Sequence, residues 1–129
     1  MKKGIMTESK LLDSSILIAY LFEGYFKKEI ESNMQLFISI LSLFEIKAKL
    51  LKKKINKKIV NDKIDFIKKR CIILFIDEKI AEIASELSAE KNLPAIDSLI
   101  YSTSQVNNLS LLTLDNDFKG LDNAEVLEI

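Results

Sequence analysis

The amino-acid sequence predicts a single α/β domain with a mostly parallel sheet covered by helices on both faces. Short apolar runs typical of buried strands alternate along the chain with segments of helical periodicity. The length of 129 residues suits one domain with a proper core. Hydrophobic residues at 48% and charged residues at 29% are ordinary for a globular protein. We therefore expect one domain over residues 1–129, with residues 1–9 as a loose polar N-terminal segment.

In the first part of the chain, the expected elements are a strand closing at 11–13, a buried helix over 14–22, a short helix to about Ser32 and a strand near 36–38. Gly24 interrupts the first helix. Ser42 and Glu45 have the spacing of a capping box, which predicts that a further helix begins there.

In the remainder, the expected elements are a helix from an Asn56 cap to Arg70, a continuously buried strand at 71–76, a helix capped by Asp77, another helix after the break at 92–95, and strands at 109–114 and 124–129. The residues predicted to face the core are Val60, Ile64 and Ile67, then Ile80, Ile83, Ala84 and Leu87, and then Ile96, Leu99, Ile100 and Val106.

The residue types that are missing exclude several kinds of site. The chain has no histidine, so a Ser-His-Asp triad and an imidazole metal site are both excluded. Its only cysteine, Cys71, lies in an apolar run, which favours a core thiol over a nucleophile. Any metal must therefore be held by oxygen, which favours Mg²⁺ or Mn²⁺. The only three glycines, Gly4, Gly24 and Gly120, lie too far apart to form a P-loop or a G-x-G-x-x-G turn.

The start of the chain predicts a cytoplasmic protein. The segment M-K-K-G-I-M-T-E-S-K has a basic start, but no apolar h-region follows it. The apolar runs are also far shorter than a bilayer span requires.

Carboxylates recur where predicted strands end or predicted helices begin. Each has a structural explanation when taken alone. Asp13 can cap a helix, Glu45 can complete its capping box, Asp97 can favour a helix dipole, and Asp115 with Asp117 can form an Asx turn. The carboxyl ends of parallel strands share one edge of a sheet, where ligands gather. Carboxylates brought together there repel one another unless a cation compensates, and a divalent metal can do this.

Four segments resemble motifs of the PIN-domain nucleases, especially the VapC-type toxins of toxin–antitoxin pairs. They are L-L-D-S-S-I-L-I at 11–18, I-S-I-L-S-L-F-E-I at 38–46, I-D-S-L-I-Y-S-T at 96–103 and L-L-T-L-D-N-D-F at 111–118. The resemblance spans about residues 10–129 and implies a three-layer α/β/α, Rossmann-like PIN domain.

This resemblance also implies what the residues do. It assigns metal coordination and catalysis to Asp13, Glu45, Asp97 and Asp115, with Asp117 as a second metal ligand at the last position. Ser14 and Thr113 fall where family members place supporting hydroxyl groups. The implied activity is a Mg²⁺- or Mn²⁺-dependent endoribonuclease, the toxin of a type II toxin–antitoxin system, with an RNA substrate, an antitoxin partner and a homodimeric state.

Other functions remain open at this point. One is a non-catalytic PIN-like module that binds RNA or acts as a scaffold, and another is a PIN nuclease of RNA processing outside a toxin–antitoxin pair. A phosphoacceptor receiver domain is disfavoured because no lysine stands at the expected strand end and Glu45 would have no role.

Basic residues concentrate in one segment although the whole chain has zero net charge. Residues 47–70 hold eleven of the nineteen basic residues against Asp62 and Asp65, so the segment is net +9 and the remainder net −9. Three interpretations of this segment are open: an RNA-facing patch, the solvated face of two helices, or a surface near which an acidic or mixed antitoxin segment docks. Arg70 is the only counterpart of arginines that often grip phosphate in related nucleases.

Aromatic residues also gather in one place, around Gly24. They are Tyr20, Phe22, Tyr25 and Phe26. Core packing or a dimer seam is a better interpretation of this cluster than base stacking.

Overall fold

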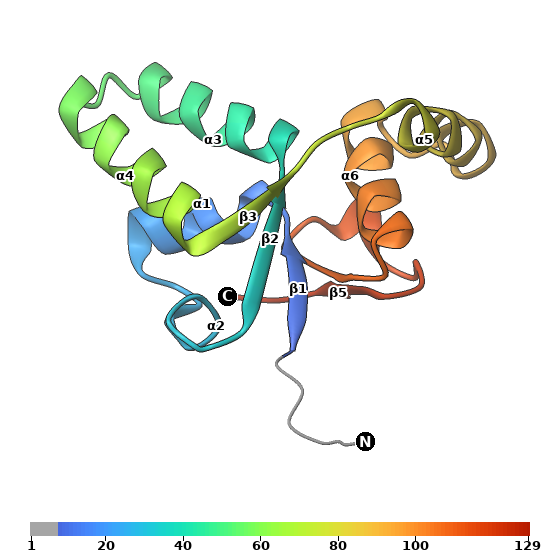
Figure 1. Cartoon of the computed structure of the whole chain (residues 1–129), viewed down its shortest axis with the longest axis horizontal. Coiled ribbons are helices and arrows are strands. Elements are labelled where there is room, and N and C mark those ends of the chain that lie inside the picture. The colour runs from blue at the N-terminus through green and yellow to red at the C-terminus, as the bar shows by residue number, and fades with distance from the viewer. Residues whose placement is uncertain (1–7) are drawn as a thin grey trace.

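The computed structural model describes residues 8–129 and places a parallel sheet at the centre of the molecule (Figure 1). The strands are β1 (Ser9–Leu12), β2 (Gln35–Ser39), β3 (Cys71–Leu74), β4 (Ser110–Thr113) and β5 (Ala124–Val126). Their order across the sheet is β3-β2-β1-β4-β5, and every pairing between neighbours is parallel. The predicted α/β class is therefore confirmed, and among the described residues the sheet is wholly parallel.

The helices are α1 (Ser14–Glu23), α2 (Lys27–Ile30), α3 (Ile40–Lys52), α4 (Lys57–Arg70), α5 (Glu78–Lys91) and α6 (Ala95–Val106), with a 3₁₀ turn η1 (Asn116–Phe118). Figure 1 shows α1, α3 and α4 on one side of the sheet and α5 with α6 on the other. No helix within residues 8–129 is long and apolar enough to cross a membrane.

Two hydrophobic clusters form the core, one on each face of the sheet. Successive strand residues point to opposite faces, and the neighbours Leu11 and Leu12 accordingly belong to different clusters. Leu12 packs with the side chains of α1, α3 and α4, whereas Leu11 packs with Ile100, Tyr101 and the completely buried Phe118. A strand with both faces covered reads as a continuous apolar run, as β1 does.

The order of the strands creates a switch point between β1 and β4. From β1 the chain moves outward through β2 to β3, and it then returns to place β4 on the other side of β1. Crevices beside the carboxyl ends of strands at such a point are the usual ligand sites of open α/β sheets. Asp13 directly follows β1, and Asp115 stands two residues after the end of β4.

The start of α3 and the first and last strands differ from what the sequence predicts. Ser42 does not cap α3. Ser39, at the end of β2, is the N-cap and accepts a hydrogen bond from the Leu41 amide at 3.1 Å. Ser42 lies buried inside the helix, and its hydroxyl has no hydrogen-bond partner among the described residues. Ser9 belongs to β1 and not to a loose segment, while residues 1–7 lie outside the described part of the chain. The last strand is limited to Ala124–Val126.

The segment 71–76 is not a continuously buried strand. β3 ends at Leu74 and is an edge strand, so Ile72 is 45% exposed and Phe75 is 70% exposed. Likewise, Ile83 on α5 and Ile96 on α6 are exposed, although their spacing predicts core positions. Periodicity identifies the apolar face of a helix but not how far the neighbouring elements cover that face.

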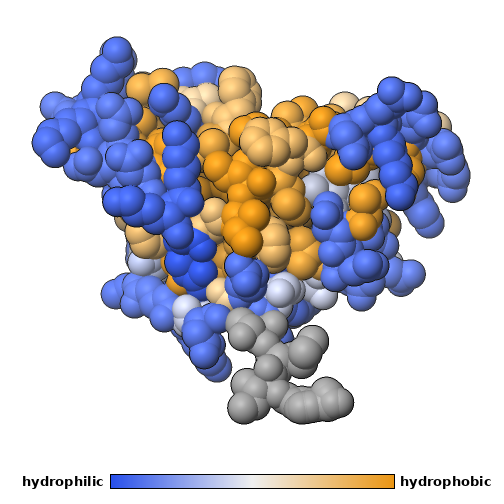
Figure 2. All heavy atoms as spheres, in the orientation of Figure 1, coloured by the Kyte–Doolittle hydropathy of each residue, from blue (hydrophilic) through white to orange (hydrophobic). Residues whose placement is uncertain are grey.

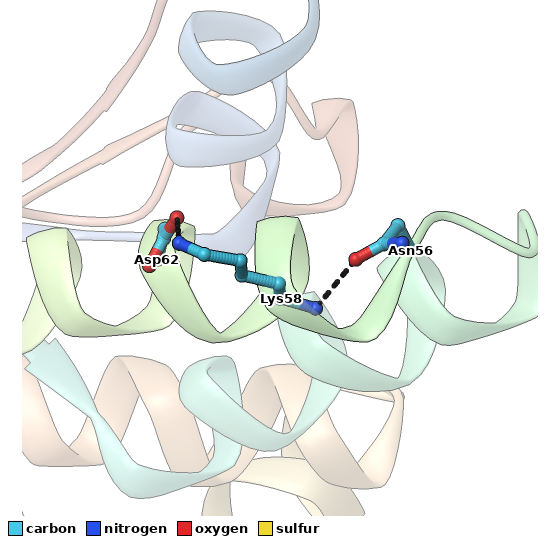
Figure 3. A network of polar contacts seen from close by, with 3 residues as sticks. All are labelled: Asn56, Lys58 and Asp62. Carbon is cyan, nitrogen blue, oxygen red and sulfur yellow. Dashed lines mark hydrogen bonds and ion pairs between the residues drawn. The ribbon is translucent and has the colours of Figure 1, made fainter.

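The predictions for α4 are confirmed. Val60, Ile64 and Ile67 are buried on one face of the helix. The Asn56 side chain caps it by accepting from the Lys58 amide at 2.8 Å (Figure 3). Cys71, where β3 begins, is buried, and burial raises the pKa of its thiol to about 11. The thiol is thus a core group, as predicted.

Candidate metal centre

Asp13 is a buried carboxylate held by two hydroxyl groups. It occupies the N-cap position of α1 but makes no side-chain capping hydrogen bond, so the capping interpretation does not explain it. Its Oδ2 atom accepts from the Ser15 hydroxyl at 2.9 Å and from the Thr113 hydroxyl at 2.8 Å. With 6% of its surface exposed, the side chain has a fixed orientation at the carboxyl end of β1.

The same two hydroxyl groups also hold the segment that follows β4. The Ser15 oxygen accepts from the Leu114 amide and the Thr113 oxygen from the Asp115 amide, each at 3.0 Å. Thr113 therefore lies where the sequence analysis expected a supporting hydroxyl, and Ser15 was missed. The sequence feature that could have identified Ser15 is its position as the second serine of L-D-S-S, two residues after Asp13.

Asp97, Asp115 and Asp117 form the tightest carboxylate group among the described residues. Each offers an oxygen, and these oxygens lie within 4.8 Å of one another. Asp97 lies in the first turn of α6. The Asp115 carboxylate accepts from the Asp117 amide at 2.9 Å, so the predicted Asx-type turn exists and itself brings these two carboxylates together.

Electrostatics connects Asp13 and Glu45 to this group, although neither belongs to it. Burial raises the pKa of Asp97 to about 7, and the negative charges of Asp115, Asp13 and Asp117 contribute to the rise. Burial also raises the pKa of Glu45, with a smaller contribution from Asp13, while the neighbouring Ser14 hydroxyl lowers it. The charge of Asp13 thus acts on both Glu45 and Asp97 and links Glu45 to the three grouped aspartates. We call these five acidic residues the carboxylate arc.

This donor set fits a hard divalent cation. All donors are carboxylate oxygens, the ligands that Mg²⁺ and Mn²⁺ prefer. Burial and then the neighbouring carboxylates raise the pKa of Asp97 to about 7, and no lysine or arginine within residues 8–129 forms an ion pair with this group. A bound divalent cation would neutralise the negative charge of these carboxylates, so the residues present fit a metal ion.

The protein is thus an α/β domain with a parallel sheet between helical layers, and its acidic residues gather at the switch point of that sheet. The chain belongs to the PIN domain family, which matches residues 10–124. A comparison with curated proteins finds no match.

Solved structures with this fold include toxin–antitoxin proteins. A toxin–antitoxin complex from Klebsiella pneumoniae contains a chain 26% identical to this one, with a TM-score of 0.76, over 93% of this chain and 99% of that chain. VapBC2 from Rickettsia felis, bound to a DNA fragment from its promoter, shares 22% identity and a TM-score of 0.76 over 91% and 97% of the two chains. VapC20 of Mycobacterium tuberculosis, a toxin that cleaves the sarcin-ricin loop, shares 14% identity and a TM-score of 0.68 over 87% and 94%.

Proposed function

We propose that this protein is a metal-dependent endoribonuclease that hydrolyses RNA phosphodiester bonds. The observation that carries the proposal is the arc of carboxylates at the switch point of the sheet, where Asp97 has a pKa of about 7. Membership of the PIN domain family supports it, and the absence of histidine leaves metal-assisted hydrolysis as the chemistry that suits these residues.

Each carboxylate has a role in this proposal. Asp97, Asp115 and Asp117 would hold Mg²⁺ or Mn²⁺, and Asp13 would complete the site from the end of β1. Glu45 would hold a second divalent ion. When bound, the metal lowers the pKa of a water molecule and neutralises charge on the scissile phosphate. The hydroxyl groups of Ser15 and Thr113 hold the Asp13 carboxylate in place, and the Thr113 oxygen also fixes the Asp115 backbone amide.

We further propose that the nuclease is the toxin of a type II toxin–antitoxin pair. The support is the likeness to the Klebsiella pneumoniae toxin–antitoxin complex, at 26% identity over nearly the whole of both chains. An antitoxin is then the expected protein partner and RNA the substrate. A toxin that cuts cellular RNA acts in the cytoplasm, the location that the sequence predicts.

The first test is cleavage of a labelled RNA pool by the purified protein, separated from any antitoxin. We expect cutting with Mg²⁺ or Mn²⁺ and none with chelator. Without a cation, the negatively charged carboxylates repel the phosphate of the RNA. Equal cutting with chelator would overturn the metal-dependent mechanism. A folded protein that cuts no RNA under any metal would favour the non-catalytic binding module.

An apolar face between the two helical arms is our candidate for the homodimer interface. Figure 2 shows apolar side chains gathered in the middle of this view, between two more hydrophilic arms. Large apolar side chains exposed in this protein include Phe44 on α3 at 71% and Phe75, directly after β3, at 70%. The aromatic cluster around Gly24 is a weaker candidate, because Tyr20, Phe22 and Phe26 pack against the core.

We expect Phe44→Ser to shift the protein from dimer to monomer, since it removes a large exposed apolar group from α3. Sedimentation measures the change, and Tyr25→Ser serves as the control at the other aromatic site. A dimer that Phe44→Ser leaves intact and Tyr25→Ser dissociates would place the interface at the aromatic cluster instead.

A further inference from the structure

The basic segment 47–70 is not uniform, because its lysines have different neighbours in the structure. The Lys58 ammonium pairs with Asp62 at 3.3 Å (Figure 3), and the Lys53 ammonium lies 5.2 Å from the centre of the Phe22 ring. Lys47 borders a separate apolar hollow on α3. Net charge alone therefore does not identify the lysines that could meet a substrate.

Two lysines and Glu45 of the carboxylate arc line the same cleft. The cleft has a volume of about 420 Å³, and its lining residues are Ser14, Ile18, Phe44, Glu45, Ala48, Lys49 and Lys52. Both lysines are exposed, and neither forms an ion pair within residues 8–129. The cleft thus combines two members of the site region with two available cations.

The spacing along α3 places these cations in line with the site. Lys49 and Lys52 follow Glu45 by four and seven residues, so they lie on the same face of the helix, about 6 Å and about 10 Å further along its axis. Figure 1 shows α3 running outward from the centre of the molecule. A phosphate backbone whose scissile group sits at the carboxylates would pass these two amines as it leaves along the cleft.

We propose that Lys49 and Lys52 bind the RNA phosphates next to the scissile bond and so fix the path of the strand along α3. This inference rests on the proposed nuclease function and assigns substrate-positioning residues to it. The remaining lysines of the segment do not line this cleft. Arg70, the one arginine, makes its hydrogen bonds to backbone carbonyls of this chain.

A structural role is the alternative that the test must separate. Lys49 and Lys52 lie in the last turn of α3, where cations favour the helix dipole. Lys68 and Lys69 lie in the last turn of α4 and are also exposed, but they do not line the cleft. Replacing either pair by glutamine removes the same charge from the same kind of helix position. The double variant Lys68→Gln/Lys69→Gln is therefore a matched control.

The experiment measures binding of a fluorescein-labelled single-stranded RNA by fluorescence anisotropy over a range of salt concentrations. Both double variants are made in the Asp97→Asn background with Mg²⁺ present, and recovery of intact RNA shows that binding was measured. We expect Lys49→Gln/Lys52→Gln to weaken binding by about tenfold and to reduce the slope of log affinity against log salt by about 1.4, the value for two single-strand phosphate contacts. The control pair should leave both quantities close to those of its parent.

A second readout uses cleavage by the protein with Asp97 intact. We expect Lys49→Gln/Lys52→Gln to raise KM with little change in kcat, because the lysines bind phosphates outside the reacting group. An unchanged salt slope, or an equal reduction in the control pair, would overturn the proposal, and so would a parent with no salt-dependent affinity for RNA. If neither the parent nor the variants cut RNA, the proposed nuclease function is wrong. The binding measurements still test whether Lys49 and Lys52 bind phosphates.

Discussion

Asp97→Asn is expected to reduce RNA cleavage by about a hundredfold or more while leaving the fold intact. Asparagine has nearly the same shape but removes the negative charge that a divalent cation requires, and the metal contributes several kcal/mol to stabilising the transition state. Asp97 is the residue best placed to show this, because it is grouped with Asp115 and Asp117 and its pKa also reflects the charge of Asp13. The assay is cleavage of labelled RNA with Mg²⁺ or Mn²⁺.

The stability of the metal-free variant provides an independent readout. In the folded parent the pKa of Asp97 is about 7, above the ordinary value of 3.8, so the folded state binds more protons between these two values. The free energy of unfolding of the parent therefore loses this contribution as pH rises through that window, and the loss is complete above about pH 7. Asp97→Asn avoids the loss, so urea unfolding in chelator should show the variant about 1–2 kcal/mol more stable at about pH 8, after allowance for solvent screening.

Added Mg²⁺ should reverse this order. Binding to the folded state raises the stability of the parent and has a smaller effect on the variant. Asp65→Asn is the matched control, because Asp65 is an exposed carboxylate on α4, away from the arc. A variant that is less stable than its parent in chelator, or that still cleaves RNA at the parental rate, would remove Asp97 from the metal centre.

The gathering of acidic residues from distant parts of the chain was predictable because parallel strands align their ends. Asp13 and Asp115 are far apart in sequence, but β1 and β4 are hydrogen-bonded neighbours, so both residues reach the same edge of the sheet. The arrangement inside the group was not predictable. The pairing of Asp97 with Asp115 and Asp117 depends on where α6 packs, and the position of Glu45 depends on where α3 begins.

The cap of α3 and the exposure of β3 were predicted wrongly, because both depend on how the elements pack in the folded protein. The capping-box pattern at Ser42 was a local match, and the serine that ends β2 became the cap instead. The run 71–76 is as apolar as a central strand, yet β3 lies at an edge where Phe75 stays exposed. Local sequence cannot tell a central strand from an edge strand that carries an interaction surface, because both are apolar.

Arg70 illustrates the same limit, since its chemistry suits both phosphate binding and a structural role. In the structure its Nε atom donates to the Ile30 carbonyl at 2.6 Å, and its Nη2 atom donates to the carbonyls of Ser32 and Met34 at 3.1 and 3.0 Å. Ile30 is the last residue of α2, and Ser32 and Met34 lie in the connection between α2 and β2. The guanidinium thus joins the end of α4 to the segment that leads into β2, and the planar fork of donors explains why an arginine stands there.

Arg70→Ala is expected to lower the free energy of unfolding by about 2–4 kcal/mol, because three charge-assisted hydrogen bonds are lost and half-buried carbonyls lose their donor. Arg70→Lys should recover only part of this loss, since one ammonium group cannot reproduce the geometry of the fork. Urea unfolding measures both variants. Lys69→Ala is the control, because it removes the neighbouring exposed charge without touching these carbonyls.

The affinity for RNA separates the two roles of Arg70 decisively. At a temperature where Arg70→Lys remains folded, its salt-dependent affinity for single-stranded RNA should equal that of the parent, because the guanidinium is already engaged with backbone carbonyls. If Arg70→Ala were as stable as the parent but bound RNA more weakly, with a lower salt slope, then Arg70 would be a phosphate ligand and its carbonyl contacts dispensable. The expected pattern is the opposite. The connection between α2 and β2 leads through β2 to the Ser39 cap of α3, so losing Arg70 loosens the approach to the helix that carries Glu45 and leaves phosphate binding to the lysines.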